Sequence, residues 1–277
     1  MIQDIRFSYG SYSVLKGVTM EVAPGQVLSI VGPNGSGKST LLRCLARVLK
    51  PQGGAVFLDG REAARISSRE LARLLGYVPQ AAGEVFPFTV LETVLLGRKP
   101  HLNWGVAQKD LAVVAQVVQF MGLAEMAQRQ MDQLSGGQKQ KVFIARALAQ
   151  EPQVFLFDEP TSSLDIRHQL EVLELVRELA CQQRRQVVMV LHDLNLAARF
   201  SDRMVMLKDG LIFAAGRPGD VLTAENVGAV YGVEASIADS AMGPYVLPLR
   251  PIAAGPAPLP ATGSCTPEKP KQEVKYA

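Results

Sequence analysis

Cysteine is scarce in this chain of 277 residues, which has only Cys44, Cys181 and Cys265. The three lie far apart, are odd in number and form no C-x-x-C pair. The sequence therefore offers neither a disulfide framework nor a thiolate metal site. We expect reduced thiols in a cytosolic protein.

Long hydrophobic runs are also missing. The best apolar run, residues 187–191, ends at His192 and Asp193, far short of the roughly 20 residues that cross a bilayer. The start of the chain lacks the basic and then apolar pattern of a secretory signal. We expect a chain that is soluble by itself and that docks at a membrane only through another protein.

Charge of one sign does not dominate. The net charge is +3, the pI is near 8.8, and no run of lysine or arginine forms a stripe. This balance gives no argument for a nucleic-acid partner. Apolar residues make up 48% and charged residues 20%, which is ordinary for a globular protein, and the length allows a full core.

The order of apolar patterns predicts an α/β fold. Alternation predicts strands on either side of a turn at Gly10, and short apolar runs predict buried strands at 27–31, 55–58, 155–157 and 187–191. Helical patterns cover 38–49, about 88–150, 166–179 and 194–200. The segments 204–207 and 211–214 flank a hairpin turn. Strands that alternate with helices imply a mostly parallel sheet covered on both faces.

The end of the chain has a different composition. Six of the seventeen prolines fall in residues 251–277, mixed with alanine, glycine and lysine. We expect a main domain at 1–250, with the helical insertion at about 88–150, and a disordered tail at 251–277.

A glycine-rich loop carries the first functional motif. Residues 32–40 read GPNGSGKST and fit the phosphate-loop pattern G-x-x-x-x-G-K-[ST], with a strand before the loop and a helix after it. The glycines let backbone N–H groups face anionic oxygens, and the helix directs its positive end to the same place. A glycine-rich turn with an accidental lysine is the weaker interpretation. The residues predicted to bind nucleotide are Gly32, Pro33, Asn34, Gly35, Ser36, Gly37, Lys38, Ser39 and Thr40.

Within this loop, two side chains have distinct predicted roles. Lys38 is expected to reach the β- and γ-phosphates, and the Ser39 hydroxyl to bind Mg²⁺.

A second motif follows four apolar residues at 154–157. Asp158, at the tip of that strand, is expected to hold Mg²⁺ with its water shell. Glu159 is expected to be the general base that polarises the attacking water. The alternative is an acidic turn before Pro160, satisfied by backbone N–H groups.

The segment Leu134-Ser135-Gly136-Gly137-Gln138 resembles the signature of the ATP-binding cassette (ABC) family, and it lies between the other two motifs as in that family. The resemblance covers about residues 2–235. It implies a P-loop NTPase cassette with a RecA-like core, an N-terminal antiparallel β-subdomain and an inserted α-helical subdomain. It also implies ATP and Mg²⁺ as the ligands.

The signature segment also has a physical interpretation. Ser135 suits the N-cap of a helix over 138–149, so its hydroxyl and the N–H groups of Gly136 and Gly137 form an anion site. The alternative is a capped helix with a flexible entry. The resemblance implies that two copies bind head to tail, each ATP lying between one phosphate loop and the other copy's signature, including Gln138.

Further positions are assigned through the resemblance. Gln80 corresponds to the glutamine that contacts Mg²⁺ and water and senses a transmembrane partner, and His192 to the switch histidine at the γ-phosphate. Asp165, in Ser163-Leu164-Asp165, corresponds to the loop that crosses the dimer interface; the alternative is an ordinary N-cap. Tyr9 corresponds to the aromatic residue that stacks on adenine, with Tyr12 as a competitor. Glu159, His192, Gln80 and Lys38 are thus the predicted catalytic residues.

Three segments indicate a subgroup. Residues 93–101, 191–197 and 231–233 are similar to subunits of importers for iron–siderophores, haem and vitamin B12. Residues 97–101 alone fit either a partner-facing or a structural loop. The resemblance implies an ATPase dimer bound under two permease subunits on the cytoplasmic side of the inner membrane, coupled indirectly to an extracellular substrate-binding protein.

Two other functions are weighed against this one. The chain could energise a different ABC transporter, or it could be a soluble ABC ATPase that acts on ribosomes or DNA. The latter predicts tandem cassettes, a long coiled-coil insert or a basic face, and the sequence has none of these features. The transported molecule is not encoded here, because its pocket would lie on other chains.

Overall fold

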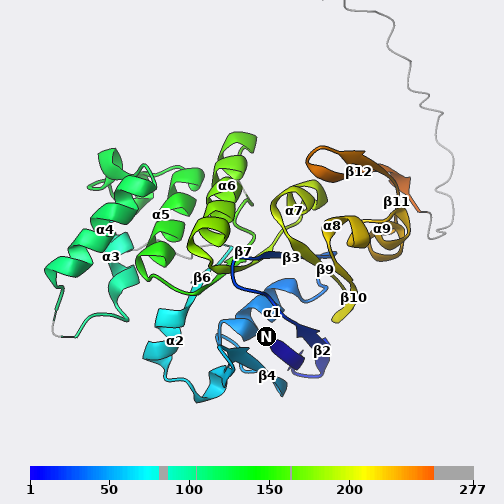
Figure 1. Ribbon diagram of the computed structural model, residues 1–277, viewed down its shortest axis with the longest axis horizontal. Helices are drawn as coiled ribbons and strands as arrows, with labels where there is room; N and C mark the ends of the chain where they lie inside the picture. Colours follow the sequence, from blue (N-terminus) through cyan, green and yellow to red (C-terminus); the bar gives the residue numbers. More distant parts are fainter. Residues whose placement is uncertain (81–86, 104, 163, 253–277) are drawn as a thin grey trace, which may run out of the picture.

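The computed structural model describes residues 1–80, 87–103, 105–162 and 164–252. A six-stranded sheet forms the centre of the molecule, in the order β10-β9-β3-β8-β7-β6 (Figure 1). Five of its strands are parallel and β10 is antiparallel to β9, as the sequence pattern predicts. The strands are β3 (Val27–Val31), β6 (Leu75–Val78), β7 (Val154–Asp158), β8 (Gln186–Val190), β9 (Arg203–Lys208) and β10 (Leu211–Gly216).

The strands β3, β7 and β8 are buried on both faces, which explains their uninterrupted apolar runs. In β3, Val27 and Val31 pack into one core together with the long helix α6 (Ile166–Gln183). Leu28 and Ile30 pack into a second core together with α1 (Lys38–Leu45). Alternate side chains therefore serve opposite layers.

A second, antiparallel sheet covers the far side of α1, in the order β2-β1-β4-β5. Its strands are β1 (Ile2–Tyr9), β2 (Tyr12–Met20), β4 (Gly53–Leu58) and β5 (Arg61–Glu62). Helix α1 ends at Leu45, four residues before the predicted end. Arg47 turns into the left-handed region (φ 56°) and its guanidinium donates to the carbonyls of Ala63 and Ile66, so the chain leaves the helix axis there.

The remaining helices divide between a lateral group and the core. Helices α3, α4 and α5 form the group at one side of the molecule (green in Figure 1), within the stretch predicted to be helical. The helices are α2 (Ser68–Leu74), α3 (Val90–Leu95), α4 (Gln108–Phe120), α5 (Gly136–Ala149), α7 (Leu194–Phe200), α8 (Pro218–Val221) and α9 (Ala224–Tyr231), with single 3₁₀ turns η1 (Ala63–Arg65), η2 (Leu96–Arg98), η3 (Ala124–Met126) and η4 (Met131–Gln133).

The loop that follows α3 is fixed on both sides. Arg98 is buried and pairs with Asp110 of α4 (Nε to Oδ1, 3.1 Å), and Nε2 of His101 lies 2.9 Å from a carbonyl at the end of α5. From the other side, Arg69 of α2 donates to the carbonyl of Pro100 at 2.9 Å. These contacts give residues 97–101 a structural role, one of the two that the sequence left open.

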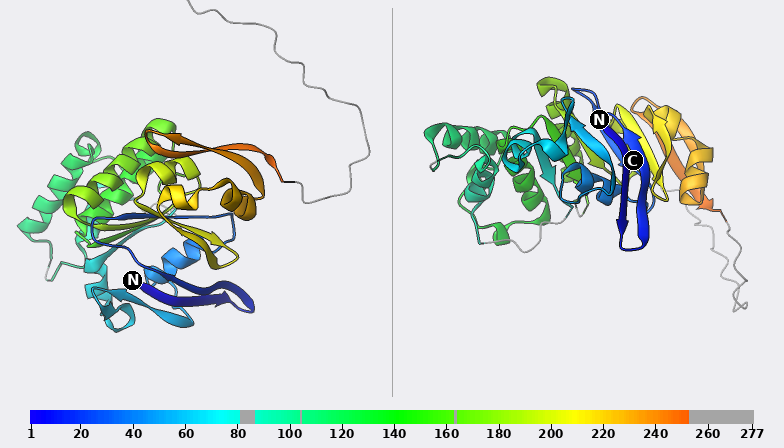
Figure 2. Two further views of the ribbon diagram at one scale, coloured as in Figure 1. Left: turned by 45° about the vertical axis from the view of Figure 1, so that its right-hand side comes forward. Right: turned by 90° about the horizontal axis from the view of Figure 1, so that it is seen from below.

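A hairpin lies on the opposite side from α3, α4 and α5 (orange in Figures 1 and 2). It consists of β11 (Val233–Ser240) and β12 (Gly243–Pro251), and it packs on α7, α8 and α9. The sequence pattern did not predict it. Pro251, the first residue of the predicted tail, belongs to β12, and residues 253–277 of that tail lie outside the described residues.

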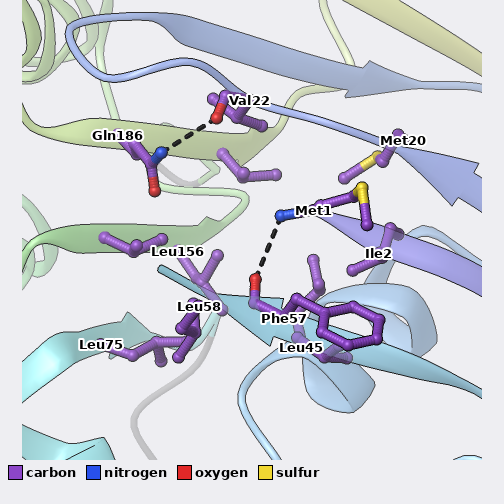
Figure 3. Close-up of a pocket in the computed structure, with 13 residues that line it drawn as sticks. Met1, Ile2, Met20, Val22, Leu45, Phe57, Leu58, Leu75, Leu156 and Gln186 are labelled. Carbon is purple, nitrogen blue, oxygen red and sulfur yellow. Dashed lines mark hydrogen bonds between the residues drawn. The ribbon is translucent and has the colours of Figure 1, made fainter. Parts of the chain in front are cut away.

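A small apolar cavity lies between the two sheets (Figure 3). Its volume is about 40 Å³, its walls include Met20, Leu45 and Leu156, and at its rim the Met1 amine donates to the carbonyl of Phe57 at 3.1 Å. A volume of this size holds one or two water molecules, so the cavity is no candidate for a nucleotide site.

Within the described parts of the chain, no helix combines the length and the apolar character needed to cross a bilayer.

Candidate functional site

The phosphate loop is tight at both ends and open in its middle. A Cβ atom on Gly32 (φ 148°) would stand 2.3 Å from the carbonyl oxygen of Leu207. A Cβ on Gly37 (φ 101°) would stand 2.9 Å from the side chain of Leu15. A Cβ on Gly35, by contrast, would have no neighbouring atom within 4 Å. Only glycine fits the two ends, and the space between them is available to a ligand.

Lys38 lies inside this loop and is 5% exposed. Its Nζ donates to the carbonyls of Gly32 (2.8 Å) and Pro33 (2.9 Å). Burial lowers the pKa of Lys38, and the charges of Glu159 and Asp158 partly offset this effect. Among the residues that the structure describes, none forms a hydrogen bond with the buried Ser36 hydroxyl. An ammonium group and an orphan hydroxyl in one cradle suit a bound phosphate.

Asp158 ends β7 beside the start of α1. The Ser39 hydroxyl donates to its Oδ1 at 2.8 Å, and the Tyr77 hydroxyl donates to its Oδ2 at 3.3 Å. Burial raises the pKa of Asp158, and these hydrogen bonds partly offset the rise. A carboxylate and a hydroxyl that already touch are hard oxygen donors of the type that Mg²⁺ prefers, so the predicted metal ligands fit the ion.

Glu159 follows Asp158 in a left-handed conformation (φ 53°), held by Ser162, whose N–H and hydroxyl both donate to the Glu159 carbonyl. Its carboxylate is contacted from two sides. Nε2 of Gln80 donates to Oε2, and Nε2 of His192 lies 2.5 Å from Oε1. Gln80 follows β6 and His192 follows β8, so three adjacent parallel strands bring these side chains to one edge of the sheet.

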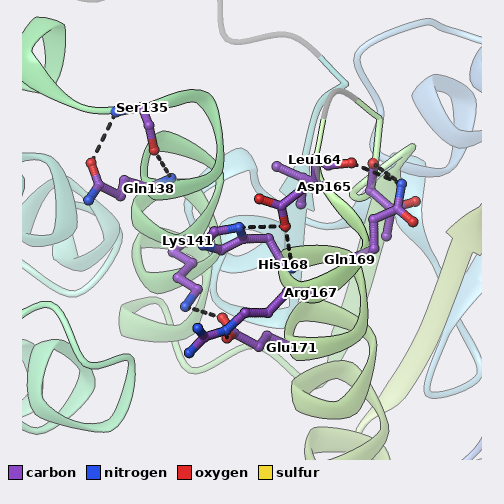
Figure 4. Close-up of polar contacts among 10 residues, drawn as sticks. Ser135, Gln138, Lys141, Leu164, Asp165, Arg167, His168, Gln169 and Glu171 are labelled. Carbon is purple, nitrogen blue, oxygen red and sulfur yellow. Dashed lines mark hydrogen bonds and ion pairs between the residues drawn. The ribbon is translucent and has the colours of Figure 1, made fainter. Parts of the chain in front are cut away.

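The signature segment begins α5. The Ser135 hydroxyl accepts the N–H of Gln138 (3.3 Å), and the Ser135 N–H donates to Oε1 of Gln138 (3.0 Å), which forms a capping box (Figure 4). The predicted N-cap is therefore present. The arrangement leaves the first N–H groups of the helix, including those of Gly136 and Gly137, at a helix N-terminus suited to an anion.

Asp165 caps the neighbouring helix α6, the alternative that the sequence left open. Its Oδ1 accepts the N–H of His168 at 2.9 Å and lies 2.8 Å from Nδ1 of the same residue. The His168 ring also lies against the signature, since a Cβ on Gly137 would stand 3.4 Å from it. Ser163, predicted to belong to the same loop, lies outside the described residues.

The predicted residues thus form two separate groups. Lys38, Ser39, Asp158, Glu159, Gln80 and His192 gather at the phosphate loop. Ser135, Gly136, Gly137, Gln138 and Asp165 gather at the ends of α5 and α6. Within the described residues, no hydrogen bond or ion pair joins the signature to the phosphate loop. The roles of both groups toward a nucleotide stay predictions.

The two candidate adenine-stacking residues face each other across the β1–β2 turn. Tyr9 is 48% exposed and its ring packs edge-on against Phe7, with centroids 4.9 Å apart. Tyr12 is 69% exposed. Both rings are available to a ligand, so the alternative between them stays open.

Sequence reasoning missed Tyr77 and Arg43. Tyr77 reaches Asp158 from β6, and a hydrogen bond to Tyr77 raises the pKa of Arg43 on α1. Neither residue belongs to a motif. The only available signal was the apolar run of β6 before Gln80, because a parallel neighbour of β7 would present its side chains to Asp158.

A phosphate loop between a buried strand and a helix, with an acidic strand end beside it, defines the class of P-loop nucleotide-binding domains. A sequence profile described as "ABC transporter" matches residues 15–162, more than half of the chain. The chain belongs to the ABC transporter family, and its fold is that of the family's ATP-binding cassette, with the expected antiparallel β-subdomain.

Individual relatives agree with this assignment. An uncharacterized ABC transporter ATP-binding protein of Methanocaldococcus jannaschii is 44% identical over 248 residues, with 90% of this chain and 97% of the relative covered. The ferric enterobactin transport ATP-binding protein of Escherichia coli is 40% identical over 253 residues, with coverages of 89% and 93%. Further relatives are named as siderophore transport and as hemin and cobalamin import ATP-binding proteins, so the resemblance to this subgroup is confirmed.

A solved structure gives the same picture. It is described as an inward-facing conformation of a metal-chelate type ABC transporter, and it superposes with a TM-score of 0.76 at 30% identity, covering 90% of this chain and 96% of that one.

Proposed function

We propose that this chain is the ATP-hydrolysing subunit of an ABC importer for metal chelates of the iron–siderophore, haem or cobalamin type. The observation that carries the proposal is the carboxylate of Glu159, held by Gln80 and His192 next to a phosphate loop. The importer names of the relatives support the direction of transport and the class of cargo.

The residues at the loop would perform the chemistry as follows. Lys38 exchanges its carbonyl partners for the β- and γ-phosphates, and the Ser36 hydroxyl gains a partner. Glu159 accepts the proton of the attacking water as the water oxygen bonds to the γ-phosphorus. The bond from the γ-phosphorus to the bridging oxygen breaks and ADP leaves, while His192 supports the γ-phosphate. Ser39, Asp158 and Gln80 would hold Mg²⁺, which when bound neutralises phosphate charge.

The second group of residues supports a dimer. In the described part of the chain, no hydrogen bond or ion pair joins the anion site at Ser135 to the phosphate loop around Lys38. We propose that a second copy brings its phosphate loop to Ser135, Gly136, Gly137 and Gln138, with Asp165 at the interface. Tyr9, or in its place Tyr12, stacks on adenine. Closure on ATP and opening after hydrolysis then form a two-state switch.

A groove of about 600 Å³ is the proposed site for a permease segment. It lies between the core and the helical group, and Tyr77 in its wall is three residues before Gln80, the predicted sensor of the transmembrane partner. Arg69 and Lys99 line it, together with Arg146, whose pKa burial lowers. These cations favour an acidic segment of the permease. Docking there would hold the chain at the cytoplasmic side of the inner membrane.

Co-expression with candidate permeases tests the proposal. We expect a stable complex with a polytopic membrane protein, ATPase activity that a loaded extracellular binding protein alters, and uptake of one labelled chelate from a panel of ferric siderophores, haem and cobalamin by reconstituted vesicles. Uptake of another solute class would support a different ABC transporter. Stimulation of ATPase by nucleic acid, with no membrane partner, would support the soluble alternative.

A further inference from the structure

The C-terminal hairpin is attached to the helix that follows the predicted switch histidine. Asn195 of α7 lies three residues after His192. The N–H of Val246 in β12 donates to Oδ1 of Asn195 at 2.7 Å, and Nδ2 of Asn195 donates to the carbonyl of Val246 at 3.2 Å. One side chain therefore satisfies both backbone polar groups of a strand residue.

This pairing is independent of the cap of the helix. Oδ1 of Asp193 accepts the N–H groups of both Asn195 (2.8 Å) and Leu196 (2.9 Å). The Asn195 side chain is therefore not needed to start α7 and is free to hold β12. Because His192 directly precedes the capping residue, a displacement of α7 would be transmitted to His192 within one turn of backbone.

Packing reinforces the same connection. The Val246 side chain is 3% exposed and belongs to the same apolar core as Ala197 and Ala198 of α7. A Cβ on Gly243, the first residue of β12, would stand 3.7 Å from the Ala198 carbonyl. The hairpin thus contacts α7 along much of its length, and the protein interior transmits such contacts stiffly.

A neighbouring contact links α9 to β9 of the central sheet. Lys208 of β9 donates to the carbonyl of Ala229 at 2.8 Å, which fixes the end of α9. The Tyr231 hydroxyl is buried there. Burial raises the pKa of Tyr231. The C-terminal unit (residues 218–251) is therefore tied to the central sheet as well as to α7.

We propose that the β11–β12 hairpin positions His192 through Asn195, so that a shift of the hairpin changes the rate of hydrolysis without a contact to nucleotide. Asn195 is a positioning residue, and the inference rests on the proposed ATPase function. The phosphate loop does not depend on this pair of hydrogen bonds. Their loss should therefore act on kcat and leave KM for ATP nearly unchanged.

The test compares Asn195→Ala with Asn226→Ala. Asn226 is a matched control, because its Nδ2 also donates to a backbone carbonyl in the C-terminal unit, that of Val221 at 2.9 Å, but it makes no hydrogen bond to α7. We expect similar Tm losses. Only Asn195→Ala should lower kcat, by roughly tenfold, a fraction of the roughly 10²–10⁴-fold that a positioned acid or base contributes, with KM changed less than about twofold.

Two further comparisons separate positioning from a folding defect. In a His192→Ala background, Asn195→Ala should lower the single-turnover rate no further. From the hairpin side, Val246→Pro removes the N–H that Val246→Ala keeps, so only the proline variant should repeat the loss of kcat.

An unchanged kcat in Asn195→Ala, or the same loss in both His192 backgrounds, would overturn the positioning role while ATPase activity of the wild type stands. A wild-type chain without ATPase activity would overturn the proposed function, and this inference with it.

Discussion

His192 and Glu159 are in direct contact at the candidate site, with Nε2 2.5 Å from Oε1. Glu159 follows the end of β7 and His192 follows β8, so the pair joins two neighbouring strand ends. With Gln80 on its other oxygen, the carboxylate is held in one orientation. A group fixed in this way can act on a water molecule without reorganisation.

Replacing Glu159 by Gln tests its role as the base. The amide retains the shape of the side chain but cannot accept a proton, so we expect turnover to fall by roughly 10²–10⁴-fold while ATP still binds. Closed dimers should accumulate and be visible by size-exclusion chromatography with light scattering. The control is Glu174→Gln, an exposed position of α6, which should behave as wild type. Near-normal turnover of Glu159→Gln would remove Glu159 as the base.

The signature is tested through its helix cap. Ser135→Ala and Thr89→Ala each remove a capping hydroxyl, that of α5 and that of α3, and each should lower the free energy of unfolding by about 1 kcal/mol. Only Ser135→Ala should also prevent ATP-dependent dimers, measured in the Glu159→Gln background. Equal dimerisation of the two variants would leave Ser135 with a structural role alone.

Asp158→Asn should separate stability from activity. Burial raises the pKa of Asp158, so its charged form costs folding free energy at pH values above the folded pKa. Without Mg²⁺, the variant should therefore have a higher Tm than wild type. Mg²⁺-dependent hydrolysis should be lost.

The pH dependence checks the sign of that effect. The Tm difference between Asp158→Asn and wild type should shrink as the pH falls through the folded pKa of Asp158, because the wild-type carboxyl then becomes neutral. A lower Tm for the variant at neutral pH would contradict the assigned cost of the buried charge.

The buried pair of Arg98 and Asp110 predicts a large loss of stability. Arg98→Met leaves the Asp110 carboxylate buried without its partner, so we expect Tm to fall by roughly 10 °C. Arg61→Met, which breaks the exposed pair with Glu70, is the matched control and should change Tm little. Differential scanning fluorimetry measures both.

The same pair predicts a dependence on acid. Although burial acts to raise it, the hydrogen bond from Arg98 holds the pKa of Asp110 below its usual range. The stabilisation is present above the unfolded pKa of about 3.9 and is lost as the pH falls through the folded value. The gap between wild type and Arg98→Met should therefore narrow in acid. A constant gap down to the acid transition would assign the loss to packing.

The parts of the fold that the sequence predicts are those with local signals. The buried run of β3, the loop that follows it and the cap at Ser135 depend on neighbouring residues. The end of α1 does not, because Arg47 leaves the helix to bind carbonyls of a distant turn. The prolines of β12 argue against a strand in the sequence. They are tolerated because β12 is an edge strand of a two-stranded sheet, and an edge strand accepts residues without an N–H.

The candidate site divides in the same way. Lys38, Ser39, Asp158 and Glu159 belong to contiguous motifs with fixed spacing. Tyr77 and Asn195 act across strands or elements far apart in the chain, at Asp158 and at Val246. Only the folded topology brings such partners together, so a single sequence does not show which residues pair.

The hydrogen bonds from Lys38 to two backbone carbonyls limit the affinity of the loop for a nucleotide. Because the Lys38 ammonium already donates to two backbone carbonyls of its own loop, a triphosphate that binds there replaces existing hydrogen bonds. The net binding free energy is only the difference between the phosphate contacts and the carbonyl contacts. A pocket of this kind binds ATP with modest affinity and releases ADP and phosphate readily. Repeated cycling requires both abilities.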